Sequence, residues 1–168
     1  MEASSSVEIR HPNRDTAAAK ATKAAVILLL LTSAGLILIV TVGGWDNLQG
    51  AQVVAIAWLL IYVLMAYYVG RWNRGVLPVA SAMAILLAVL AAVAAPSWFD
   101  RDKSGFDNPG LPPGILGLLC VLLIPVSLLL IAFAMRGFQQ KWNVEVEVPR
   151  GEEPPYGDTR SEPRPVAG

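Results

Sequence analysis

The stretch AAVILLLLTSAGLILIVTV, residues 24–42, decides the fold class of this chain because it contains no charged side chain. An α-helix rises about 1.5 Å per residue, so about 20 apolar residues span the hydrocarbon core of a bilayer, which is about 30 Å thick. Three further runs of similar length also lack Asp, Glu, Lys, Arg and His. The sequence therefore predicts four membrane-spanning helices, at residues 24–42, 51–69, 76–95 and 114–135.

The segments outside these runs are short. One tail, 1–23, precedes the first run, another, 136–168, follows the last, and the longest connection is 96–113. Each is below the size that usually holds an independent core. We therefore predict an all-α integral membrane protein with a membrane domain at 24–135 between these two tails. Two short connections favour an antiparallel four-helix bundle, and the polar ends of the chain favour disordered tails.

Lysine and arginine are distributed unevenly between the two sides of the predicted bundle. The two tails and the second connection carry all of them except Arg101 and Lys103, which lie on the other side. Because cytoplasmic segments are enriched in Lys and Arg, both termini are predicted to be cytoplasmic. Frequent arginine and alanine are typical of GC-rich bacterial genomes and favour a bacterial cytoplasmic membrane.

Tryptophans flank the predicted spans on both sides. The indole ring has an apolar body and a polar N–H group, so it prefers the level of the lipid headgroups. We therefore expect anchors at the membrane interface. They are Trp45, Trp72, Trp98 and Trp142.

Small side chains recur at every fourth position of the third run. In lipid, helices associate where small residues let their backbones approach closely. This stripe is therefore a candidate for helix packing within one chain or, alternatively, for contact with another copy or a partner. It consists of Ala80, Ala84, Ala88 and Ala92.

Two residues of the fourth run have distinctive chemistry. Pro125 removes a backbone donor, which predicts a structural kink or, alternatively, a functional hinge. Cys120 is the only cysteine, and its apolar surroundings favour a packing role over a reactive thiol. With one cysteine and one histidine, the sequence excludes a structural zinc site, and no cofactor is predicted.

The connection between the third and fourth runs contains a weak match to a calcium-binding loop. Asp100, Asp102 and Ser104 have the spacing of the first three ligands, but Leu111 stands where such a loop needs a bidentate Glu. The alternative is a solvated turn whose side chains bond to the nearby backbone.

The two tails differ in pattern. A helix beginning at Asn13 or Asp15 is expected to continue into the first span, and residues 1–12 are expected to be disordered. Residues 144–148, VEVEV, alternate in a way that predicts a strand. This strand has no evident partner in the chain, so it is expected to join the edge of a partner's sheet or, alternatively, to be a flexible or surface-lying segment.

The sequence contains no phosphate-binding glycine loop, His-Glu zinc motif or nucleophile elbow. Its net charge is zero, which argues against nucleic acid as a partner. The expected function is that of a non-enzymatic accessory, scaffold or assembly component of a larger membrane complex, in contact with the bilayer and with another membrane protein or itself. One alternative is an oligomeric small transporter or channel. A second is a membrane enzyme that uses residues at the interface.

Overall fold

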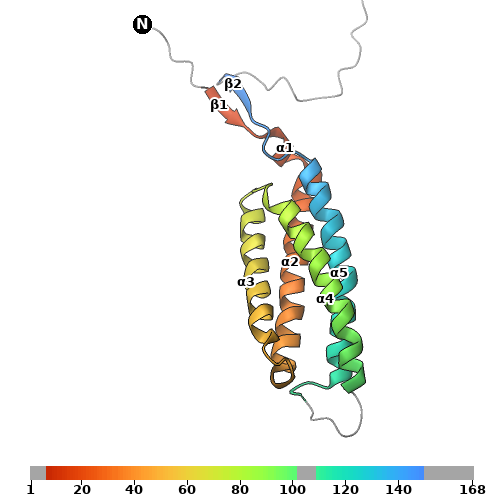
Figure 1. Cartoon of the computed structure of the whole chain (residues 1–168). Helices are drawn as coiled ribbons and strands as arrows, with labels where there is room; N and C mark the ends of the chain where they lie inside the picture. The colour runs from red at the N-terminus through yellow and green to blue at the C-terminus, as the bar shows by residue number, and fades with distance from the viewer. Residues whose placement is uncertain (1–6, 102–108, 150–168) are drawn as a thin grey trace, which may run out of the picture.

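Four long helices make up most of the residues that the structure, a computed structural model, describes, which are residues 7–101 and 109–149. Each helix is long and apolar enough to cross a membrane, as the sequence predicts. Consecutive helices run in opposite directions along the molecule (Figure 1). They are α2 (Ala17–Gly43), α3 (Ala51–Gly70), α4 (Val76–Arg101) and α5 (Pro113–Gln139).

The first long helix begins later than predicted. A single helical turn, α1 (Pro12–Asp15), ends at Thr16, whose extended backbone separates it from α2. The Thr16 hydroxyl accepts a hydrogen bond from the backbone N–H of Ala19 at 3.1 Å and so caps α2. The cap is therefore Thr16 rather than Asn13 or Asp15, because its side chain reaches a free backbone donor of the first turn.

Helix α4 continues beyond the predicted span at 76–95, through Pro96, to Arg101. Proline removes one backbone donor but does not prevent the following residues from remaining helical. Trp98 lies in this last part of α4 and is buried, and it packs beside Gly44 of the first connection. This packing stabilises the last turn of α4.

The first and last segments that the structure describes pair with each other. Strand β1 (Val7–Arg10) runs antiparallel to β2 (Val146–Pro149), with Ile9 opposite Glu147. Figure 1 shows both strands beyond one end of the bundle. The predicted disorder of residues 7–10 is therefore wrong, and the predicted strand at 144–148 does have a partner within the chain. The folded bundle brings the two ends together, so their separation in sequence is no obstacle.

Helices α4 and α5 form the most extensive helix–helix contact, and α2 packs against both α3 and α5. Neighbouring α3 and α4 contact each other far less. Apart from Gly117, the buried positions of α5 after Pro113 alternate between three and four residues apart, which is typical of left-handed helix bundles. These positions are Leu116, Cys120, Leu123, Ser127, Leu130, Ala134 and Gly137.

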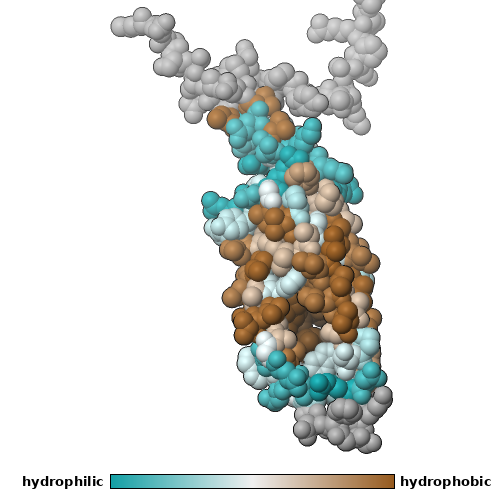
Figure 2. All heavy atoms as spheres, viewed as in Figure 1, coloured by the Kyte–Doolittle hydropathy of each residue, from teal (hydrophilic) through white to brown (hydrophobic). Residues whose placement is uncertain are grey.

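Apolar side chains form a broad band around the middle of the molecule, and polar residues gather at its ends (Figure 2). Many leucines, isoleucines and valines of all four helices are exposed within this band. In water such a surface would aggregate, but in a bilayer it meets lipid. The distribution is consistent with a protein embedded in a membrane.

Candidate functional site

The predicted alanine stripe is only partly buried. Ala80 and Ala84 have no exposed surface, Ala88 is half-buried and Ala92 is exposed. The reason is geometric. Because an α-helix has about 3.6 residues per turn, residues spaced four apart shift gradually from one face of the helix to the next. The buried face of α4 instead continues through Ala91 and Ala95.

Pro125 lies within a continuous α5 and its ring is exposed on the surface of the bundle. The helix has no break on either side of this residue. Ser127, two positions further on, is fully buried. A kink or hinge at Pro125 stays a prediction.

The four tryptophans predicted to be interface anchors have different surroundings. Trp45 is 48% exposed, as an interface anchor would be. Trp98 is buried against Ala95, Leu116 and Cys120. Trp142 has no exposed surface at all. The rings of Trp98 and Trp142 therefore pack against protein, and the role of these tryptophans as interface anchors stays a prediction.

Trp142 is the centre of a cluster that joins three segments of the chain. Its ring stands edge-on to Trp72, with centroids 5.2 Å apart, and its indole N–H donates to the Gln140 side chain at 3.0 Å. Gly137 leaves room for the ring, since a Cβ there would lie 3.1 Å from it. Lys23 of α2 lies over Trp72, with Nζ 4.1 Å from the ring centroid.

Hydrogen bonds to backbone carbonyls hold the C-terminal segment in place. Arg14 Nε donates to the Trp142 carbonyl at 2.7 Å, and Asn13 donates to the Lys141 carbonyl at 3.1 Å. From the second connection, Arg74 Nε donates to the Phe138 carbonyl at 2.7 Å and Arg74 stacks on the Phe138 ring. These donors satisfy carbonyls at and beyond the end of α5. We call residues 7–15 and 140–149 together the terminal platform.

The weak calcium-loop match falls mostly outside the described residues. Asp100 lies in the last turn of α4, while Asp102 and Ser104 belong to the range 102–108 that the structure does not describe. Among the described residues, no three His, Cys, Asp or Glu side chains form a group that could hold a metal ion.

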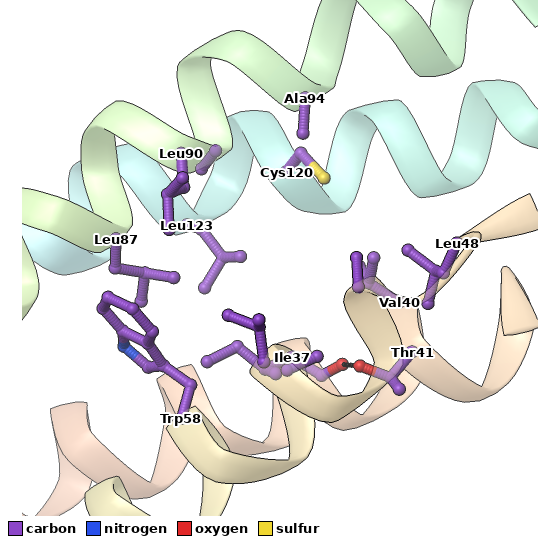
Figure 3. A pocket seen from close by; sticks show the side chains of 14 residues that line it. Ile37, Val40, Thr41, Leu48, Trp58, Leu87, Leu90, Ala94, Cys120 and Leu123 are labelled. Atoms are coloured by element: carbon purple, nitrogen blue, oxygen red, sulfur yellow. Dashed lines mark hydrogen bonds between the residues drawn. The ribbon is translucent and has the colours of Figure 1, made fainter.

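An apolar cavity of about 250 Å³ lies between the four long helices, toward the end opposite the terminal platform. Figure 3 shows its wall, with Leu48, Trp58, Leu90 and Cys120 from different segments around it. It lies where α3 and α4 make few contacts, and Figure 2 shows a hollow in the apolar band. Thr41 does not supply a polar group to this space, because its hydroxyl donates to the Ile37 carbonyl at 2.7 Å.

Buried hydroxyls without a hydrogen-bond partner among the described residues lie on each long helix. Ser33, Tyr62 and Ser127 are near the middle of α2, α3 and α5, and Ser81 lies near the start of α4. The Trp58 indole N–H makes no hydrogen bond of standard geometry within these ranges, but it interacts with the Tyr62 side chain one turn away, so the serine hydroxyls are the clearest unpaired groups. These groups are candidates for contact with a polar guest inside the bundle.

The comparisons with known proteins add no identity: no family model matches the chain, and no curated protein or solved structure is significantly similar to it.

The sequence reasoning missed the residues that build the terminal platform. In the sequence, Arg14 and Arg74 contribute only to the charge distribution that predicts the orientation, yet in the structure each donates a hydrogen bond to a backbone carbonyl of a distant segment. A signal for the strand pairing is present, because residues 7–10, VEIR, alternate apolar and charged positions as 146–148 do. No local signal points to the burial of Trp142.

Proposed function

We propose that this protein is a non-enzymatic accessory or scaffold component of a larger membrane complex. The observation that supports the proposal most is the terminal platform, in which both chain ends fold together outside the apolar band. A two-stranded ribbon has an open edge on each strand, and an extended segment of a partner can add to such an edge. An isolated two-stranded ribbon is marginally stable, so a partner strand would stabilise it.

The distribution of charge supports an orientation with the platform in the cytoplasm. Of the Lys and Arg residues that the structure describes, only Arg101 lies at the opposite end. The others lie in the platform or at the helix ends beside it. The positive-inside rule then favours a cytoplasmic platform, where it would meet a cytoplasmic part of the partner.

The test is affinity purification from native membranes in mild detergent, using a C-terminal tag and mass spectrometry. The wild-type protein should retain a stoichiometric membrane partner. Trp142→Ala should lose that partner because it removes the centre of the platform, whereas Trp45→Ala, an exposed tryptophan at the other end, should keep it. Isolation of the wild-type protein as a lone species would contradict the proposal.

A second candidate function is a transport path within the bundle, which the unpaired hydroxyls of Ser33, Tyr62 and Ser127 favour. Unpaired polar groups are costly in an apolar interior unless they gain a polar guest. The purified protein in liposomes should then carry a small polar solute, and a triple Ser33→Ala/Tyr62→Phe/Ser127→Ala variant should not. Equal flux of both proteins would exclude this path.

A further inference from the structure

A basic cleft of about 510 Å³ lies between the terminal platform and the start of the first long helix. Its wall combines residues of β1, α1 and α2 with one ring from the second connection. The residues that matter here are Arg10, His11, Arg14, Asp15, Lys20 and Trp72. Three cations and one carboxylate give the wall a formal charge of +2 with His11 neutral (3 − 1 = 2).

The positive charge continues toward the membrane. Lys23 lies over the Trp72 ring that lines the cleft, with its Nζ 4.1 Å from the ring centroid. Arg14 itself is fixed, because its Nε donates to the Trp142 carbonyl at 2.7 Å. In addition, His11 Nδ1 is buried and has no hydrogen-bond partner among the described residues. Cations that line one cleft are stabilised by an anion bound between them.

The location of the cleft beside the apolar band indicates which class of anion it could bind. Lys20 is one helical turn before Lys23, and the uncharged run of α2 begins at residue 24. The cleft therefore lies directly beside the apolar band, at the level where lipid headgroups begin. Basic pockets beside transmembrane helices on the cytoplasmic side suit anionic headgroups, and Arg and Lys both bind phosphate well.

We infer that this cleft binds the phosphate group of an anionic phospholipid. Lys20 and Lys23 supply charge at the headgroup, fixed Arg14 contributes a planar guanidinium, and Trp72 covers the glycerol region. A soluble phosphate shares this chemistry, but only a lipid would also place its acyl chains against the exposed apolar surface next to the cleft.

Native mass spectrometry of the full-length protein tests this, with phosphatidylglycerol or phosphatidylcholine added to the detergent solution. The wild-type protein should bind one phosphatidylglycerol more tightly than phosphatidylcholine. Lys20→Gln/Lys23→Gln should weaken that binding about tenfold or more, because two charges near the headgroup are lost. Lys20→Arg/Lys23→Arg should restore it.

The matched control is Arg71→Gln/Arg136→Gln, which removes two exposed cations at the same end but outside the cleft. This variant should keep the binding of the wild-type protein. An equal loss in the control, or no preference for phosphatidylglycerol, would overturn the inference. Complete displacement of the lipid by excess inorganic phosphate would overturn the assignment to a lipid.

Discussion

Small side chains set how closely the helices approach, and their position on the helix decides which of them matter. Ala84 is fully buried and Ala92 is exposed, although both belong to the same four-residue repeat. Gly137 is a similar case, since a Cβ there would lie 3.1 Å from both Leu77 and Trp142. The sequence therefore predicts that small residues lie at helix contacts, but it does not predict which residues of the alanine repeat are buried.

Ala84→Leu should therefore lower the stability of the bundle, whereas Ala92→Leu should leave it nearly unchanged. The larger side chain at position 84 must displace packed neighbours, which costs about 1–3 kcal/mol. At position 92 it would meet lipid. Thermal unfolding in detergent, followed by circular dichroism, measures the difference. Equal melting temperatures of the two variants would contradict the assigned faces.

At the scale of elements, hydropathy predicts the four helices because a charged residue in the bilayer core is costly and the apolar runs stand out. The ends of the helices are harder to predict, since they depend on contacts made elsewhere. Helix α4 passes Pro96 where Trp98 can pack, and α2 begins where Thr16 can cap it. The β1–β2 pair depends on the whole bundle, because its strands lie at opposite ends of the described chain.

The register of this strand pair gives a direct prediction. Ile9→Cys/Glu147→Cys places two cysteines directly opposite each other, at a separation that a disulfide can bridge. Ile9→Cys/Val148→Cys shifts the pairing by one residue and turns the two side chains to opposite faces. In a Cys120→Ala background, mild oxidation should cross-link the first pair much faster, as read by intact mass. Equal rates would contradict the register.

At the scale of the whole molecule, α3 stands apart from α4 although a tight turn connects them. The cavity between the four helices results from this separation. It was not predictable from the sequence, because the apolar runs do not reveal which helix pairs pack closely. The buried face of α4 packs mainly against α5, so only a small part of the surface of α4 contacts α3.

Ala94→Leu tests the cavity, because Ala94 lines it. The added side chain has space to occupy, so this variant should change stability by less than about 1 kcal/mol, in contrast to Ala84→Leu. The same thermal unfolding experiment measures both. A loss at position 94 as large as at position 84 would mean that the space is already filled by protein.

If each of the four long helices crosses the membrane, residues 7–10 and 146–149 lie on the same side, where they can pair as β1 and β2. Single cysteines at Ile9, Asp46 and Glu145, in a Cys120→Ala background, can be labelled with a membrane-impermeant maleimide in intact cells and after lysis. Position 46 should react in intact cells, whereas positions 9 and 145 should react only after lysis. Labelling of positions 9 and 145 from opposite sides of the membrane would contradict it.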